Sequence, residues 1–175
     1  MASKIIYIGI AVVILAVIAA LLLIQGGAPA ATPTPTAAPQ TVTIGALMPL
    51  TGGLQTYGIG SRDAIALAVE DANAMCKNVK FQLVVEDTAT DPTRALEKLQ
   101  TLYARGVRFV VGPMSSREVS AVKSFADQNN IIIFSPSSTS PLLAIAGDWI
   151  YRMVPTDLAQ AKAIVDLVNY LHIKK

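Results

Sequence analysis

The sequence has very little of the chemistry that metal and redox sites need. It contains one cysteine, Cys76, and one histidine, His172, in 175 residues. A single cysteine excludes an intramolecular disulfide bond, and one cysteine with one histidine cannot form a Cys/His metal cluster. The only imidazole lies three residues from the end of the sequence, so no predicted loop offers a base for a Ser/His/acid triad. We therefore expect neither a metal centre nor an enzyme.

Charged residues are also few, and acidic and basic residues are mixed along the chain. Charged residues make up 15 % of the sequence, and the formal net charge is +2. No basic run or stripe of the kind that binds nucleic acid stands out, so nucleic acid is not an expected partner. The stretch "YGIGSRD" has Asp63 where a dinucleotide-binding fingerprint requires its third glycine, so no nucleotide cofactor is expected either.

The first long feature that is present is an apolar run from Ile5 to Ile24, which contains no charged residue. A helix of this length measures about 30 Å and spans a bilayer, whereas the apolar part of a signal peptide usually has about 7–15 residues. The length favours an uncleaved transmembrane anchor, and the small residues of Ala28-Pro29-Ala30 leave a cleaved signal segment open. In both cases residues 1–4 stay in the cytoplasm. Residue 41 onward would then lie outside, at the cell surface or in the periplasm.

Residues 25–40, "QGGAPAATPTPTAAPQ", are an uncharged Pro/Thr/Ala/Gly tract. Such a composition cannot build a core and favours an extended chain, so we expect a linker. From residue 41 onward the pattern is that of a folded domain. The remaining length, about 135 residues, suffices for one modest core.

Apolar runs alternate with helical patterns along this domain. The expected strands are "VTIGALMPL", "KFQLVVED", "VRFVVG" and "IIIFS". The helical patterns that follow them include two with clear start signals: Asp91 before Pro92, and the capping-box spacing of Ser115 and Glu118. A short "WIYRMV" and a last helical pattern, "TDLAQAKAIVDLVNYLHI", follow. This order predicts an α/β fold with a parallel sheet and helices on both faces.

Ligands of such sheets bind beyond the carboxyl ends of the strands, where three unusual loops are expected. They are residues 50–60, 112–116 and 135–141. Ser115 or Ser116 would start a helix whose free amides suit a carboxylate or phosphate, although a plain helix cap is the alternative. In "SPSSTSP", Pro136 and Pro141 stiffen a loop rich in hydroxyls, which could equally be an ordinary turn.

Three other side chains lie near this edge. Tyr57, among glycines, is either a core or surface aromatic or the wall of a pocket. Glu86 and Asp87 are adjacent on an expected strand, so their side chains point to opposite faces and do not form a catalytic pair. We expect one of them to pair with a nearby arginine or to cap a loop.

Several segments, in order and spacing, resemble the type I periplasmic binding proteins, and more narrowly the leucine/isoleucine/valine-binding branch that serves ABC importers. They are "IGALMPLTGGLQTYGIGSRDAIALAVEDAN", "VVEDTATDPTRALEKLQTLYARGVRFVVGPMSS", "IIIFSPSSTSPLL" and "YRMVPTD". The resemblance covers residues 42–158. It implies a non-enzymatic, two-lobed protein that closes on a small ligand, usually an amino acid, and works with the membrane subunits of an importer.

The resemblance also implies a site. Ser116 would give its hydroxyl and amide to the α-carboxylate of the ligand. Thr139 would donate its amide to the carboxylate and turn its hydroxyl to the ammonium group, and Ser137 would offer its backbone carbonyl to the ammonium. Tyr57 would flank the ligand's side chain. No cofactor and no metal is implied.

In the family the chain crosses to a second lobe near "VPTD", and that lobe supplies the opposite wall of the pocket. We therefore expect residues 41–155 to be the N-terminal lobe and residues 156–175 the first helix of a missing second lobe. A truncated form with half the ligand site would bind an amino acid weakly. The alternative is a sensor or receptor ectodomain, or an interaction module, that uses the same lobe with a partner chain.

The last expected helix carries apolar residues at helical spacing on one face. This face could pack back on the lobe, pair with another chain or stay exposed. These residues are Leu158, Ala161, Ile164, Val165, Val168 and Leu171.

Overall fold

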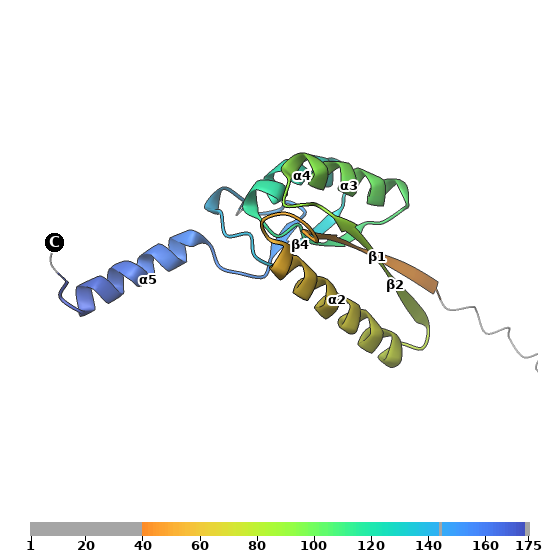
Figure 1. Ribbon diagram of the computed structural model, residues 1–175, viewed down its shortest axis with the longest axis horizontal. Helices are drawn as coiled ribbons and strands as arrows, with labels where there is room; N and C mark the ends of the chain where they lie inside the picture. Colours follow the sequence, from red (N-terminus) through yellow and green to blue (C-terminus); the bar gives the residue numbers. More distant parts are fainter. Residues whose placement is uncertain (1–39, 144, 174–175) are drawn as a thin grey trace, which may run out of the picture. The chain divides into compact units, whose positions relative to one another are not determined.

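The computed structural model of the protein describes residues 40–143 and 145–173, and its centre is a five-stranded sheet (Figure 1). The strands are β1 (Gln40–Met48), β2 (Val79–Asp87), β3 (Phe109–Val111), β4 (Ile132–Ser135) and β5 (Ile150–Arg152). The helices are α2 (Gln55–Met75), α3 (Pro92–Ala104), α4 (Ser116–Gln128), the short 3-10 turn η1 (Pro141–Leu143) and α5 (Asp157–Tyr170). The strand order is β2-β1-β3-β4-β5, and every neighbouring pair is parallel. The predicted parallel α/β sheet is confirmed.

Helices α3 and α4 lie together on one face of the sheet, which we call the covered face (Figure 1). Both helices begin as predicted: the Asp91 carboxylate accepts from the Arg94 amide, and Ser115 and Glu118 form a capping box. Burial on this face is nearly complete, so it forms the main core of the lobe. Its largest buried side chains are Leu47, Leu99, Leu102, Val110, Val119, Val122 and Ile133.

The opposite face, which we call the open face, is covered only in part. Helix α2 packs over β1 and β2, where Ala46, Met48 and Met114 are buried. Helix α2 does not cover the aromatic side chains that project from β3, β4 and β5, and these are partly exposed to solvent. They are Phe109, Phe134 and Tyr151, with exposed fractions of 46 %, 38 % and 49 %. An open apolar hollow of about 280 Å³ lies on this face. The expected cover of helices on both faces is therefore complete on one face only, within the described residues.

One strand and the start of one helix differ from the sequence-based prediction. The segment "WIYRMV", to which we assigned no strand, forms β5, with Ile150 opposite Ile133 of β4. Helix α2 begins at Gln55, so the second half of the predicted 50–60 loop is helical. A Cβ at Gly58 would lie 2.1 Å from the Pro49 carbonyl oxygen. This close approach requires glycine and outweighs its low helix propensity.

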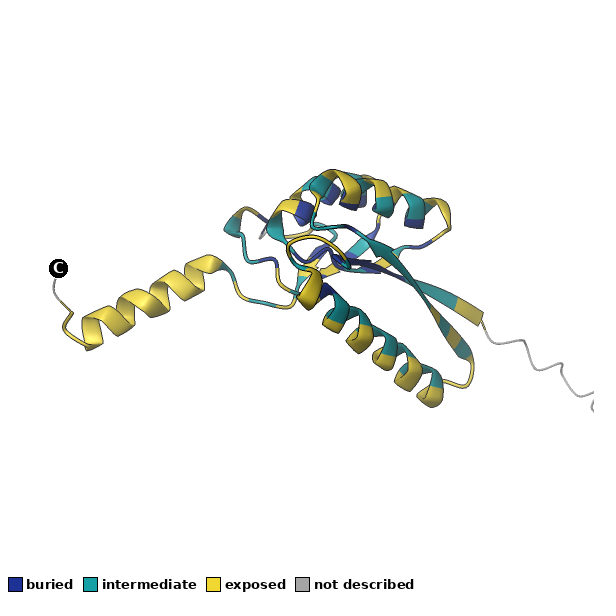
Figure 2. Cartoon of the chain, in the orientation of Figure 1, coloured by how far each residue is buried: buried dark blue, intermediate teal, exposed yellow. Residues whose placement is uncertain are grey.

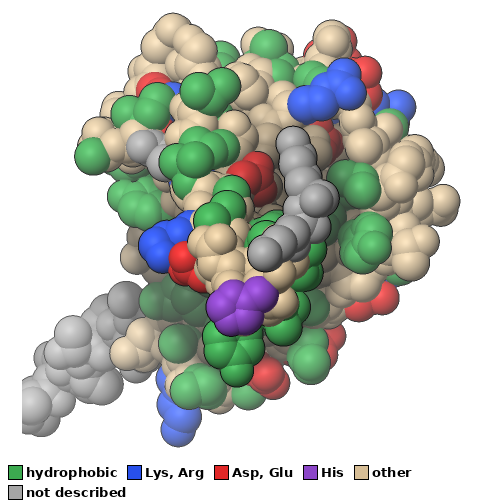
Figure 3. All heavy atoms as spheres, turned by 90° about the vertical axis from the view of Figure 1, so that its left-hand side faces the viewer, with side chains coloured by type: hydrophobic (Ala, Val, Ile, Leu, Met, Phe, Trp, Pro, Cys, Tyr) green, Lys and Arg blue, Asp and Glu red, His purple; other side chains and the backbone are tan. Residues whose placement is uncertain are grey.

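Helix α5 has no buried residue (Figure 2). Its expected apolar face is exposed, with Leu158 at 67 %, Val165 at 57 % and Leu171 at 54 %. In the space-filling view from the side on which α5 lies in Figure 1, hydrophobic side chains gather on the surface (Figure 3). The apolar face of α5 was expected to pack on the lobe, to pair with another chain or to be exposed. In the described part of the chain it is exposed.

No helix within residues 40–143 and 145–173 is long and apolar enough to cross a membrane. The predicted anchor or signal segment, residues 5–24, lies outside the described residues. So does the predicted 25–40 linker except for Gln40, which is the first residue of β1.

Candidate ligand-binding site

The loops that follow β3 and β4 meet at the carboxyl edge of the sheet. The Ser116 hydroxyl oxygen, in the first turn of α4, accepts two hydrogen bonds from the second loop: one from the Ser138 hydroxyl at 3.2 Å and one from the Ser140 amide at 3.2 Å. The parallel order of β3 and β4 brings both strand ends to the same edge. The two serine-rich loops therefore form one unit.

Most hydroxyls of the second loop are used inside the protein. Ser135 donates to the Pro113 carbonyl at 2.7 Å, and Ser137 donates to the Met114 carbonyl at 2.8 Å. The Ser140 hydroxyl accepts from the Leu142 amide at 3.3 Å. These bonds, with that of Ser138, hold the loop in one shape. Among residues 135–140, only the hydroxyl of Thr139 has no partner in the described part of the chain.

A small set of backbone groups also stays unpaired at this edge. In the described residues, the amides of Ser116, Arg117 and Thr139 donate to no protein acceptor, and the Ser137 carbonyl accepts from no protein donor. The two α4 amides are free because the first turn of a helix has no intrahelical acceptors for them. These groups lie at the junction of the two loops and are available to a ligand.

The chemistry of these free groups suits a zwitterion. The Ser116 oxygen already accepts two hydrogen bonds, so its own proton is free for an external acceptor. Together with amides at a helix N-terminus, this hydroxyl favours a carboxylate. The Ser137 carbonyl and the Thr139 hydroxyl oxygen are acceptors, which suit an ammonium group. Within the described ranges, no group of three His, Cys, Asp or Glu side chains could hold a metal ion.

Tyr57 is the predicted site residue that the structure leaves apart from the others. It lies in the first turn of α2, with 67 % of its surface exposed, and not in a loop as expected. Ser61, one turn later on the same face of α2, has its hydroxyl 4.0 Å from the Met114 sulfur. This face of α2 is therefore turned toward Met114, in the loop that precedes Ser116.

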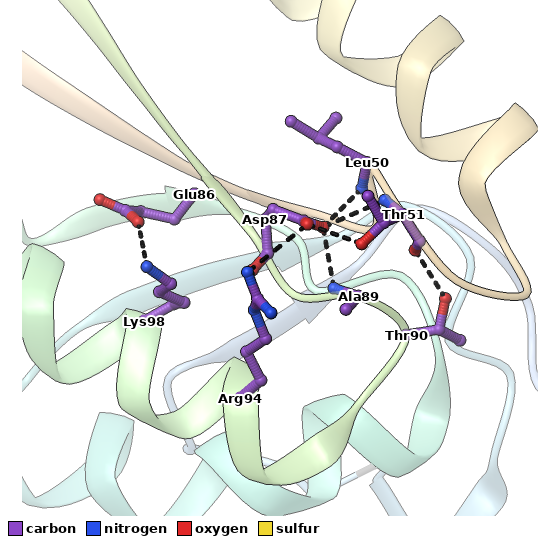
Figure 4. Close-up of polar contacts among 8 residues, drawn as sticks. All are labelled: Leu50, Thr51, Glu86, Asp87, Ala89, Thr90, Arg94 and Lys98. Atoms are coloured by element: carbon purple, nitrogen blue, oxygen red, sulfur yellow. Dashed lines mark hydrogen bonds and ion pairs between the residues drawn. The ribbon is translucent and has the colours of Figure 1, made fainter.

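The start of α2 is held by Asp87, at the end of β2 (Figure 4). Its carboxylate accepts from the Leu50 amide at 2.9 Å, the Thr51 hydroxyl at 2.7 Å and the Ala89 amide at 2.8 Å, and Arg94 lies 3.7 Å away. Burial would raise the pKa of Asp87, but the Thr51 hydroxyl and the backbone amides outweigh it and hold the pKa below its ordinary value. The carboxylate thus stays charged and caps the loop before α2.

Glu86 instead pairs with Lys98 at 3.0 Å and Arg105 at 3.3 Å on α3. The expectation that one of the two acids pairs with an arginine or caps a loop is confirmed, and Asp87 does both. Neither carboxylate belongs to the junction of the serine-rich loops.

One residue at the junction was not predicted as part of the site. Arg152 of β5 donates to the Ser140 carbonyl at 2.8 Å and reaches the Ser138 carbonyl at 3.5 Å. Its only sequence signal is a single positive charge inside the apolar run "WIYRMV". That charge can be placed at the junction only once β5 is known to lie beside β4.

The parallel sheet, the cross-braced loops and the free donors at their junction define the lobe of a ligand-capture protein. The sequence profile of the periplasmic binding proteins matches residues 41–175. The chain belongs to this family, whose fold binds ligands and is not enzymatic.

Individual relatives agree with this assignment. The chain is 38 % identical over 143 residues to a functionally uncharacterized protein of Methanocaldococcus jannaschii, which covers 76 % of this chain and 34 % of that protein. It is 32 % identical over 140 residues to a substrate-binding protein of the chemotactic signal transduction system of Halobacterium salinarum (74 % of this chain, 34 % of that protein).

A solved structure is similar as well. The branched-chain amino acid transporter substrate-binding protein of Streptococcus pneumoniae, in complex with isoleucine, superposes with a TM-score of 0.64 at 26 % identity. The match covers 67 % of this chain and 35 % of that chain. The chain thus spans about a third of the length of these relatives, 34 % to 35 %.

Proposed function

We propose that the protein captures an amino acid of the leucine/isoleucine/valine class outside the cytoplasm for an ABC importer. The observation that carries this proposal is the group of free donors and acceptors at the loop junction. They are the amides of Ser116 and Thr139, the proton of the Ser116 hydroxyl, the Thr139 hydroxyl and the Ser137 carbonyl. The isoleucine complex of the S. pneumoniae relative supports the ligand class. The periplasmic character of the family supports the extracytoplasmic location.

Each residue has a role in this proposal. The carboxylate accepts from the Ser116 hydroxyl and from the amides of Ser116 and Thr139. The ammonium donates to the Ser137 carbonyl and the Thr139 hydroxyl oxygen, and Tyr57 lines the side-chain end of the ligand. Hydrogen bonds to charged groups contribute about 1.5–3 kcal/mol each, so three on the carboxylate would dominate the affinity of this lobe.

The proposal divides the chain into residues 5–24 as a membrane anchor or signal segment, residues 25–40 as a linker, residues 41–155 as the lobe and residues 156–175 as the first helix of a second lobe. A ligand on the lobe alone keeps water on one side. The 175-residue chain should therefore bind leucine only with a Kd of about 1 mM or weaker.

The direct test is a leucine titration of the 175-residue chain, in detergent, followed by backbone amide NMR signals. We expect shifts at Ser116 and Thr139, and we expect Ser116→Ala to abolish them. The matched control is Ser120→Ala, an exposed serine one turn further along α4. 4-Methylpentanoate, which lacks the ammonium group, should bind more weakly than leucine. An absence of shifts at both amides with saturating leucine would refute the proposal, and a submillimolar Kd would refute the half-site interpretation.

A second candidate is a sensor component, because the H. salinarum relative serves a chemotactic system. The two candidates differ in the membrane partner and not in the ligand site. Cross-linking of the protein in its native membrane, followed by mass spectrometry, should recover importer subunits in the first case and a signalling receptor in the second.

A further inference from the structure

Two successive peptide groups flank Thr139, and they differ in how many of their polar groups are hydrogen-bonded within the protein. The peptide that joins Thr139 to Ser140 is fixed on both sides: its N–H donates to the Ser116 hydroxyl at 3.2 Å, and its carbonyl accepts from the Asp157 amide at 3.0 Å. This peptide has no free polar group for a ligand within the described residues.

The preceding peptide, which joins Ser138 to Thr139, is held on its carbonyl side only. Arg152 reaches this carbonyl at 3.5 Å and the Ser140 carbonyl at 2.8 Å. In a planar trans peptide the C=O and N–H groups point in opposite directions. A carbonyl turned toward Arg152 therefore turns the Thr139 N–H away from β5, where it has no acceptor among the described residues.

Arg152 is well placed to do this because β5 is a strand and not a loop. Its register opposite Ser135 puts the arginine beside the first residue of the serine-rich loop. None of the ion pairs of the described residues involves Arg152, although the side chain is half-buried. Its positive charge next to the junction thus favours an anionic ligand group there.

We propose that Arg152 is a positioning residue for ligand capture. It holds the carbonyls on both sides of Thr139, and so it aims the Thr139 amide at the ligand carboxylate, while its charge favours that carboxylate. The inference rests on the proposed function of the same site and adds a residue that does not touch the ligand.

The test compares Arg152→Gln and Arg152→Lys with the wild-type 175-residue chain in the leucine titration described above. Glutamine loses the charge and the planar fork, and we expect the leucine concentration at half-maximal shift to rise about tenfold or more. Lysine keeps the positive charge and a donor nitrogen but loses the planar guanidinium, and we expect a smaller rise. The control Arg105→Gln removes the same charge at the end of α3, away from the junction, and should leave the midpoint unchanged.

A ligand-free measurement separates positioning from general destabilisation. In Arg152→Gln, hydrogen exchange of the Ser140 amide should become about tenfold faster, because its loop loses a charge-assisted anchor. The Val122 amide, inside α4, should exchange at the wild-type rate, and Tm should match that of the control.

The outcomes distinguish the two proposals. If the wild-type chain shows no leucine-dependent shift, the proposed function fails and this inference fails with it. If the wild-type chain binds leucine and Arg152→Gln binds it within twofold of the Arg105→Gln control, only the inference is overturned. Unchanged Ser140 exchange in Arg152→Gln overturns it too.

Discussion

The two faces of the sheet have similar side chains and very different surroundings. In β4, Ile133 points to the covered face and is 0 % exposed, whereas its neighbour Phe134 points to the open face and is 38 % exposed. Phe134 instead stacks on Tyr151 of β5, with ring centroids 5.3 Å apart. Two adjacent apolar residues of one strand thus differ in burial because different elements lie above them.

The handedness of the connections explains the difference. The chain moves in one direction across the sheet from β2 to β3 and from β3 to β4, and in the opposite direction from β1 to β2. Right-handed crossovers therefore put α3 and α4 on one face and α2 alone on the other. One helix cannot cover five strands, so the part of the open face over β3 and β4 stays exposed in the described chain.

The largest expected effect is on the covered face. Ile133→Ala should lower the free energy of unfolding by about 2–4 kcal/mol, because it removes buried apolar atoms and leaves a cavity in the main core. Urea unfolding monitored by circular dichroism measures this. A loss below about 1 kcal/mol would mean that the covered face repacks easily and that the two faces do not differ in packing as the structure indicates.

A smaller effect is expected where α2, the helix on the open face, is attached. Asp87→Asn should destabilise the fold by about 1–2 kcal/mol at neutral pH, because a charged acceptor of several hydrogen bonds is lost. The folded pKa of Asp87 is lowered, so its contribution is full above the ordinary value of 3.8 and is lost as the pH falls through the folded pKa.

Urea midpoints measured at several pH values check this prediction. The stability difference between wild type and Asp87→Asn should shrink as the pH falls below 3.8. Asp63→Asn is the control, since its carboxylate is 63 % exposed, and it should change stability little at any pH. A difference that stays constant down to the acid transition would contradict the role of the charged Asp87.

Phe134→Ala alters the residue next to Ile133, on the open face of the same strand. We expect a loss of about 1 kcal/mol, since the ring is partly solvated in the folded state and the substitution removes its stacking on Tyr151 and its partial burial. The same urea experiment applies. A loss equal to that of Ile133→Ala would show that the open face is covered in solution.

The smallest effect is expected in α5. Ile164→Ser replaces a side chain that is 54 % exposed on a helix with no buried residue. Such a surface change should shift the free energy of unfolding by about 0.5 kcal/mol or less. A larger loss of stability would identify a contact of α5 with the rest of the protein.

Local signals in the sequence predicted much of the fold. The caps at Asp91 and Ser115 mark the starts of α3 and α4, since each depends on side chains within three residues of the helix start. The start of α2 could not be predicted in this way, because Gly58 lies inside the helix for a tertiary reason: a Cβ there would lie 2.1 Å from the Pro49 carbonyl oxygen. Strand β5 has three residues, one of which is Arg152, so it lacks the continuous apolar run that marks the equally short β3.

For the candidate site, the sequence determined which groups come to one edge: Ser116, Ser137 and Thr139 follow neighbouring parallel strands. Which of their polar groups remain free depends on the folded arrangement of the two loops, and so does the position of Arg152 of β5 beside them. Helix caps follow from local pattern, whereas the strand order and the pairing of each hydroxyl and peptide depend on atoms that are far apart in the sequence. Hydrogen bonds require contact at about 3 Å, and only the folded chain provides it.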